Sequence, residues 1–252
     1  MADCVYGAVT DRGDRRSENQ DSILCLTDRE QEAGLFIVAD GMGGLSHGGQ
    51  VSRYIAERFA LWWKRDFPEM IGNGGAEEDI REFLEQEIWD INQELLYFRK
   101  NEGSRFGSTL SLLLLYQENF YIENMGDSRI YLLRESLFRQ LTEDQSLAAQ
   151  LVREGQLSES EAESFPRKNV LTMCLGMFEI PRSNFISGKL QRGDVFLICS
   201  DGLHNQVCPD RMREILGRKE LTAQERAKML RACVPPGMGK DNISAIVAEI
   251  LE

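Results

Sequence analysis

The sequence predicts an α+β fold in which antiparallel β-sheets are covered by helices. Four short apolar segments between Leu110 and Leu141 are separated only by turn-forming residues, as in a β-meander. Segments with a helical period lie in separate blocks instead of alternating with the strands. The 252 residues contain no repeat or linker long enough to divide the chain, so we expect a single domain spanning residues 1–252.

The N-terminal part predicts two strands followed by two helices. Val5–Thr10 and Gly34–Ala39 are short, apolar-rich segments that are each followed directly by an aspartate. Two helices with one apolar face are expected at about Gln50–Pro68 and Glu77–Phe98, with a loop at 71–75 between them. The first helix is expected to end near its proline, because proline lacks the N–H that a helix interior needs.

The remainder of the chain predicts mainly hairpins, then a helical block. Strands are expected at Leu110–Tyr116, Phe120–Met125, Arg129–Arg134, Leu137–Leu141, Asn184–Gly188, Asp194–Cys199 and Ile243–Glu249. Two short helices are expected within Leu147–Phe165, where Ser158 and Glu161 have the spacing of a capping box. Two further helices are expected at Pro209–Leu216 and Thr222–Cys233.

The charge balance argues against nucleic acid as a partner. The chain has 29 Lys and Arg against 41 Asp and Glu, a formal net charge of -12, whereas a phosphate backbone is bound by clustered cations. The longest apolar run, Leu110–Tyr116, is too short to span a membrane. The N-terminus lacks the basic and apolar regions of a secretion signal. We therefore expect a cytoplasmic protein with no membrane partner.

The cysteines favour the same compartment. The six cysteines are scattered, without a C-x-x-C pair or a neighbouring histidine, which excludes a typical zinc site and a disulfide scaffold. Several lie within apolar runs, so we interpret them as reduced core residues. They are Cys4, Cys25, Cys174, Cys199, Cys208 and Cys233.

Five aspartates share one local context, next to a strand that is predicted to be buried. They are Asp21, Asp40, Asp127, Asp201 and Asp241. For any single one, a role in a turn is the more frequent explanation, because Asp-Gly is a common turn signal. Their recurrence favours a shared cleft, where carboxylates would repel one another unless cations lay among them. Oxygen ligands without Cys or His indicate Mg²⁺ or Mn²⁺. The glycines after Asp40 would let a main-chain group approach an ion or a phosphate.

Seven motifs in this order resemble the PPM (type-2C) metal-dependent serine/threonine protein phosphatases of the bacterial type. They are Arg16-x-x-Asn19-Gln20-Asp21, Asp40-Gly41-Met42-Gly43-Gly44, Gly107-Ser108-Thr109, Gly126-Asp127-Ser128-Arg129-x-Tyr131, Leu141-Thr142-x-Asp144, Ser200-Asp201-Gly202-Leu203 and Asp241-Asn242-Ile243-Ser244. The resemblance implies a four-layer α/β/β/α sandwich, with two stacked antiparallel sheets flanked by helices. It also implies hydrolysis of phosphoserine and phosphothreonine in proteins.

The resemblance assigns roles to the aspartates. Asp40 would bridge two Mn²⁺ or Mg²⁺ ions, with the Gly41 carbonyl completing one shell. Asp21, Asp201 and Asp241 would hold the pair directly or through water. Asp127 would help to hold a third, weaker ion.

The resemblance implies that Arg16 binds the substrate phosphate, because a guanidinium fork matches two phosphate oxygens. Without the motif, Arg16 would more simply be interpreted as a surface charge. Asp40 and Arg16 are thus the predicted catalytic residues. The ions would share a water, lower its pKa and aim the resulting hydroxide at phosphorus.

Three residues depart from the family pattern. Met42 occupies the position of a histidine that animal relatives offer as a general acid, so the proton for the leaving group must come from elsewhere. Gln20 replaces a frequent glutamate, and Gln145 replaces a histidine, which puts that loop's substrate contact in doubt. His47 is near in sequence, but a lone loop histidine is more often incidental.

The resemblance also bears on partners and alternatives. Residues 147–176 correspond to a variable flap, and the basic segment 166–169 is connected with substrate docking or is simply a solvated turn. The expected partners are phosphorylated proteins, substrates of a Ser/Thr kinase, and the chain is expected to be monomeric. Two alternatives remain: a pseudophosphatase that binds a partner without chemistry, and a phosphatase dedicated to one signalling regulator.

Overall fold

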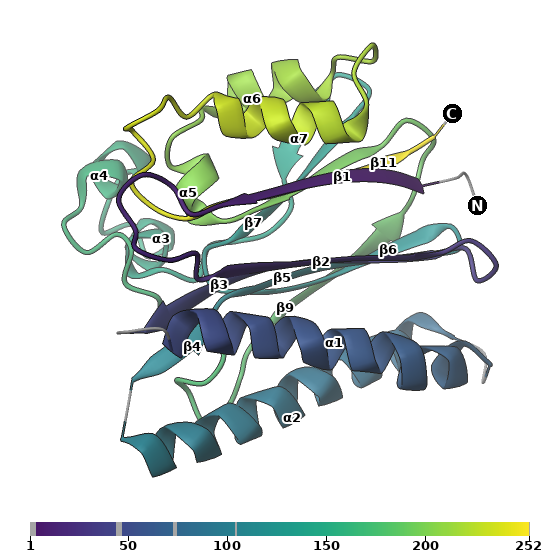
Figure 1. The fold of residues 1–252 in the computed structure, drawn as a ribbon, viewed down its shortest axis with the longest axis horizontal. Coiled ribbons are helices and arrows are strands. Elements are labelled where there is room, and N and C mark those ends of the chain that lie inside the picture. The colour runs from purple at the N-terminus through teal and green to yellow at the C-terminus, as the bar shows by residue number, and fades with distance from the viewer. Residues whose placement is uncertain (1–3, 44–46, 73–74, 104, 252) are drawn as a thin grey trace.

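The computed structural model describes residues 4–43, 47–72, 75–103 and 105–251. Gly44 of the glycine motif, and Asn73 and Gly74 of the predicted loop, lie outside these ranges. Two antiparallel sheets lie face to face, with helices on both outer sides (Figure 1). The predicted α+β, four-layer architecture is therefore confirmed.

Each sheet is built from strands that are distant in sequence. The first has the order β1-β11-β10-β7-β8, formed by Cys4–Asp11, Ile243–Ile250, Val195–Cys199, Arg129–Arg134 and Leu137–Gln140. The second has the order β2-β3-β5-β6-β9, formed by Asp21–Asp28, Ala33–Gly43, Leu110–Tyr116, Asn119–Met125 and Asn184–Lys189. The short strand β4 (Phe106–Ser108) pairs with the end of β3.

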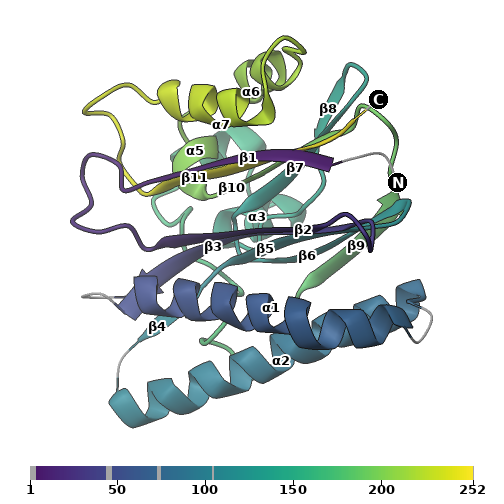
Figure 2. The same ribbon diagram turned by 45° about the vertical axis from the view of Figure 1, so that its right-hand side comes forward.

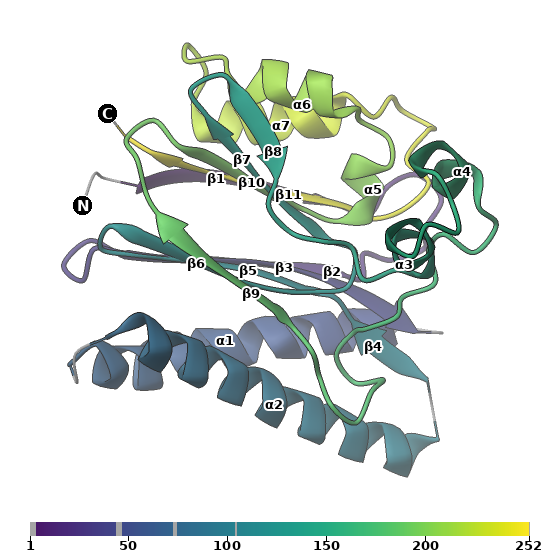
Figure 3. The same ribbon diagram turned by 180° about the vertical axis from the view of Figure 1, so that it is seen from behind.

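The outer layers are helical. Helices α1 (His47–Gly72) and α2 (Glu77–Glu102) cover the second sheet, and α6 (Pro209–Leu216) and α7 (Ala223–Ala232) cover the first (Figure 2). Three short helices, α3 (Leu147–Arg153), α4 (Glu159–Ser164) and α5 (Asp201–His204), lie at one end of the sandwich (Figure 3). None of the described helices combines the length and the apolar composition that a membrane span requires.

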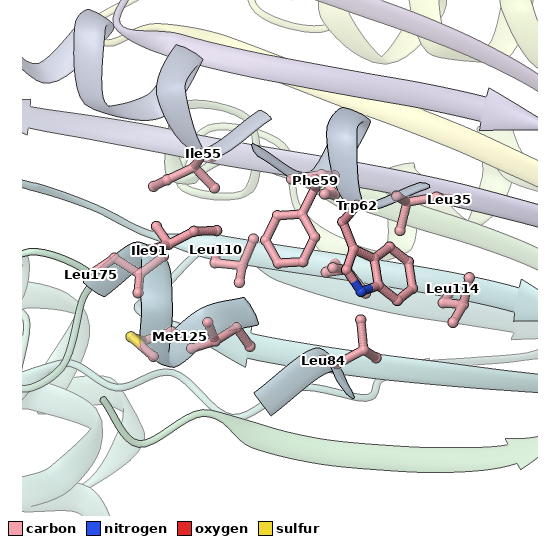
Figure 4. Close-up of a cluster of buried hydrophobic side chains, with 14 of the residues drawn as sticks. Leu35, Ile55, Phe59, Trp62, Leu84, Ile91, Leu110, Leu114, Met125 and Leu175 are labelled. Carbon is pink, nitrogen blue, oxygen red and sulfur yellow. The ribbon is translucent and has the colours of Figure 1, made fainter. Parts of the chain in front are cut away.

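Burial on both faces explains the apolar runs of the central strands. In β3, Leu35 and Ile37 contact the helices, whereas Phe36 and Val38 contact the other sheet, as the alternation of a strand dictates. Under α1 and α2 the core is closely filled (Figure 4). Its labelled members are Leu35, Ile55, Phe59, Trp62, Leu84, Ile91, Leu110, Leu114, Met125 and Leu175.

Several boundaries differ from the prediction. α1 continues past Pro68 to Gly72, because the buried Phe67 and Met70 hold the last turns against the sheet. Strand β2 was not predicted, since its Asp21–Asp28 segment mixes polar and apolar residues. β4 and α5 were also missed, because three or four residues carry no recognisable period.

The thiols agree only in part with the prediction. All six cysteines are free. Cys174 and Cys199 are buried, and burial raises the pKa of each thiol to about 12. Cys208 is exposed at the N-terminus of α6, so the prediction of a core residue is wrong there.

Candidate metal centre

A cleft at one end of the sandwich gathers most of the predicted site residues. It has a volume of about 220 Å³. Its lining includes Arg16, Asp40, Gly41, Asp127, Asp201 and Asp241. Asp21 is buried beside it and pairs with Asp40 in the β2–β3 register. Residues 225 positions apart, such as Arg16 and Asp241, are in direct contact here.

The carboxylates come from both sheets. Asp21 begins β2, and Asp40 lies within β3, which continues to Gly43 instead of ending at the aspartate as predicted. Asp127 lies in the turn between β6 and β7, which belong to different sheets. Asp201 begins α5, with only Ser200 between it and the end of β10, and Asp241 precedes β11. The cleft therefore forms only when the sheets stack.

Hydrogen bonds fix the backbone around Asp40. Its N–H donates to Thr109 Oγ1 at 2.9 Å, and the Thr109 N–H donates to the Asp40 carbonyl at 2.9 Å. The Thr109 hydroxyl also shares a 2.8 Å hydrogen bond with Ser128 Oγ, beside Asp127. Two of the acidic residues are thus tied together through buried hydroxyls.

The glycines next to the aspartates are required by close packing. A Cβ on Gly41 would lie 2.0 Å from the Gly48 carbonyl oxygen, and one on Gly202 would lie 1.9 Å from the Asn242 carbonyl oxygen. Gly41 lies within β3 and pairs with Ser108, so the Asp40-Gly41 pair does not form the turn for which Asp-Gly is a common signal. Both glycines instead let neighbouring backbones approach the cleft.

Burial and mutual repulsion disfavour the ionised carboxylates. Burial, followed by repulsion from Asp21 and Asp201, raises the pKa of Asp40 well above its ordinary range. Burial raises the pKa of Asp201 to about 8 and that of Asp127 to about 7, and neighbouring carboxylates add to both shifts. Burial also raises the pKa of Asp21 to about 6. Such a cluster is short of positive charge.

Arg16 supplies a cation at the edge of the cleft. Its Nη2 donates to Asp241 Oδ2 at 2.6 Å, while 54% of its side chain remains exposed. This hydrogen bond raises the pKa of Arg16 further. The guanidinium therefore pairs with one predicted metal ligand and still faces solvent.

The oxygen atoms of the cleft fit a hydrated divalent cation. Oδ1 of Asp21 and Oδ1 of Asp201 are buried without a hydrogen-bond partner, and each orphaned oxygen is a candidate ligand. Within the described ranges, no three Asp, Glu, His or Cys side chains are already drawn into a compact ligand group. Mg²⁺ keeps several waters and needs only one or two carboxylates, so an open arrangement of this kind can accept it.

Two residues whose contacts the sequence did not predict hold the Asp127 turn. His204 Nε2 lies 2.9 Å from the Asp127 carbonyl oxygen, and burial lowers the histidine pKa to about 3. The neutral ring therefore donates from Nε2. Gln145 Oε1 accepts the Gly126 N–H at 3.0 Å, while its Nε2 donates to the Arg182 carbonyl. Gln145 thus supports the turn.

The departures from the family pattern have structural counterparts. Met42 lines the cleft, whereas His47 stacks on Phe106 and lines a separate groove between α1 and α2. The Gln20 side chain donates to Glu18 Oε1 at 2.7 Å. Asn242 accepts the Gln20 N–H at 2.8 Å and so fastens this loop to the start of β11. The sequence did not predict this contact between Gln20 and Asn242.

A second cavity adjoins the cleft. It has a volume of about 470 Å³, is lined by α3 and α4 among others, and shares Asp127 and Asn169 with the cleft. Within the basic segment 166–169, Lys168 Nζ donates to the Glu163 carbonyl at 3.0 Å. The segment from 147 onwards that was predicted as a flap thus lies beside the candidate site.

Sequence comparisons give a consistent result. A family model described as protein phosphatase 2C matches residues 11–235. A serine/threonine phosphatase of Listeria innocua is 34% identical over 242 residues, covering 95% of this chain and 93% of the relative. The protein phosphatase PhpP of Streptococcus pneumoniae is 30% identical over 245 residues, with 97% and 96% coverage.

Solved structures extend the similarity to the fold. The serine/threonine phosphatase of S. agalactiae superposes with a TM-score of 0.89 at 28% identity, covering 99% of this chain and 100% of the other. The catalytic domain of the phosphatase PstP, in complex with two manganese ions, gives a TM-score of 0.82 at 26% identity, with 99% coverage of both chains.

Proposed function

Because the chain belongs to the protein phosphatase 2C family and is thus a metal-dependent serine/threonine protein phosphatase, we propose that its clustered aspartates form the metal centre. Convergence on a single cleft is the observation that carries this proposal. Four of the carboxylates are buried enough for their pKa values to rise, and Arg16 lies at the edge of the same cleft.

Each residue has a role that follows from its position. Asp40, which is repelled by the four other carboxylates, would be the central ligand, with the Gly41 carbonyl beside it. Asp21, Asp201 and Asp241 would complete the sites of two ions directly or through water. Asp127, at the boundary with the second cavity, would contribute to a third.

The chemistry divides between the ions and the chain. Divalent ions, when bound, lower the pKa of water and offset the charge of a phosphoryl group. Arg16 would exchange its contact with Asp241 for two oxygens of the substrate phosphate, since a guanidinium fork matches them. The neutral, partly buried His204 supports the Asp127 turn through its hydrogen bond to the Asp127 carbonyl. Manganese or magnesium fits the all-oxygen ligands.

The substrates of a protein phosphatase are phosphorylated proteins. We further propose that these are substrates of a Ser/Thr kinase and that the enzyme acts in the cytoplasm as a monomer without membrane or nucleic-acid partners. The free cysteines and the net charge of -12 support this setting. The cavity beside the flap helices α3 and α4 gives space for polypeptide next to the phosphorylated residue.

The decisive experiment compares Asp40→Ala with the wild type. Phosphate release from p-nitrophenyl phosphate and from a phosphothreonine peptide is measured with and without Mn²⁺. The substitution should lower turnover at saturating Mn²⁺ by roughly 100-fold or more, as loss of a central electrostatic group does. Asp210→Ala, on an exposed side chain of α6, is the matched control. Wild-type turnover in Asp40→Ala would refute the proposed centre, and an inactive wild type that binds Mn²⁺ would indicate a pseudophosphatase.

A further inference from the structure

Two buried hydroxyls hold one oxygen of the Asp21 carboxylate. Ser200 Oγ donates to Asp21 Oδ2 at 2.8 Å, and Ser244 Oγ donates to the same oxygen at 2.7 Å. Both serines are fully buried. Oδ1 of the same carboxylate is buried and has no hydrogen-bond partner. One half of the carboxylate is therefore fixed, and the other is left for a ligand.

The donors behind Ser244 form a chain with a fixed direction. Thr10 Oγ1 lies 2.9 Å from Ser244 Oγ, a distance at which either hydroxyl could donate. Ser244 has one hydroxyl hydrogen, and it donates that hydrogen to Asp21. Thr10 must therefore donate to Ser244, and it accepts in turn from Asn19 Nδ2 at 2.8 Å. Hydrogen bonds aligned in this way strengthen one another.

The chain of hydroxyls joins the two sheets. Asp21 belongs to β2 of the second sheet, whereas Thr10 and Ser244 are register partners on β1 and β11 of the first. Ser200 follows β10, and its Oγ also accepts the Ser244 N–H at 3.0 Å. Neither serine can rotate away without breaking two hydrogen bonds. The orientation of Asp21 is thus set by the packing of the sheets.

From this geometry we infer that Ser200 and Ser244 are positioning residues, which hold Oδ2 of Asp21 and present Oδ1 to the metal ions. Thr10 orients the Ser244 hydroxyl. The inference rests on the metal centre proposed above and extends it to residues that contact no ion. A carboxylate held in one orientation loses little freedom on binding, and partners of this kind commonly change metal affinity by about 10- to 100-fold.

The test measures Mn²⁺ binding by calorimetry and stability by thermal unfolding. Ser244→Ala should raise the Kd for Mn²⁺ by roughly 10-fold or more. Thr10→Val, which keeps the shape but removes the hydroxyl, should raise it by a smaller factor, and Thr10→Ser should restore it. Ser111→Ala is the matched control, because this buried serine donates to Asn124 and not to an aspartate of the cleft. It should lower the melting temperature and leave the Kd unchanged.

The outcomes separate the inference from the proposed function. If Ser244→Ala binds Mn²⁺ as the wild type does, the inference is wrong and the metal centre is unaffected. If Ser111→Ala weakens binding as much as Ser244→Ala, general destabilisation explains both, and the inference again fails. If the wild type binds no Mn²⁺, the proposed centre itself is wrong.

Discussion

Replacing Asp201 with Asn should stabilise the metal-free protein at neutral pH. Asp201 is 8% exposed, and its pKa is raised from 3.8 to about 8, first by burial and then by Asp127 and Asp241. Below pH 3.8 the carboxyl is protonated in both states and costs nothing. As the pH rises towards 8, the unfolded chain ionises while the folded protein retains the proton, so stability is progressively lost.

The size of this effect follows from the pKa difference. One pKa unit corresponds to about 1.4 kcal/mol. Between the unperturbed pKa and neutral pH, the penalty therefore grows to roughly 4 kcal/mol, against roughly 2 kcal/mol near pH 5. In the wild type, Asn205 Nδ2 donates a hydrogen bond to Asp201 Oδ2 at 3.1 Å. Asparagine at position 201 removes the charge but keeps an oxygen that can accept this hydrogen bond. Most of the penalty should therefore be relieved.

The assay is denaturant unfolding in a chelator at about pH 5 and pH 7. The free energy of unfolding of Asp201→Asn should be higher than that of the wild type at both pH values, with the larger difference at pH 7. Asp210→Asn, whose side chain is 92% exposed, should match the wild type. Saturating Mn²⁺, at about 100 times its Kd, should add roughly 2.7 kcal/mol to the wild type and much less to Asp201→Asn.

The refuting result is equally specific. A metal-free Asp201→Asn protein that is no more stable than the wild type at pH 7 would show that this carboxylate bears no uncompensated cost. A gap that stays constant between pH 5 and pH 7 would show that the gain has another origin, such as altered packing.

Two further predictions concern Arg16 and Glu123. Arg16→Ala should lower kcat/KM for p-nitrophenyl phosphate by roughly 10- to 100-fold, because it removes a charged hydrogen bond to the substrate. The control Arg15→Ala, at an exposed residue, should leave kcat/KM unchanged. If both variants lose the same activity, the effect comes from the general positive charge of this region and not from a contact of Arg16. Glu123 is fully buried on β6, and burial raises its pKa from 4.5 to about 7, so its protonated form favours folding and stability should fall between these pH values. Glu123→Gln should flatten this slope and add about 3 kcal/mol in alkaline denaturant titrations, and an unchanged slope would assign the pH dependence to other groups.

The layers of the fold were predictable because long elements have strong periods. The stripes of α1 and α2 and the apolar runs of β5 and β10 each cover many residues, so local irregularities do not hide them. β2 was not predicted, because it is an edge strand whose sequence mixes polar and apolar residues and is partly exposed. The end of α1 was misjudged because tertiary packing of Phe67 and Met70 outweighed the local effect of Pro68.

The site was predictable to the extent that it depends on single residue types at strand boundaries. The five aspartates and Arg16 were identified from their motifs, and the structure places them together. The supporting contacts were not predictable. His204 and Gln145 reach the Asp127 turn from 77 and about 19 residues away in sequence, and no periodicity records such a contact. Only the stacking of the sheets creates it.

The opposition between stability and function in this cleft explains its construction. Carboxylates gathered at the sheet ends destabilise the metal-free fold, as their raised pKa values indicate. A flexible cluster would relieve that repulsion by moving apart. Here movement is restricted, because Thr109 holds the backbone of Asp40 and two serines, Ser200 and Ser244, hold the carboxylate of Asp21. In the metal-free protein the cluster therefore keeps its cost, as repulsion or as protons retained on the carboxyl groups, and cation binding should stabilise the packing of the two sheets as well as the site.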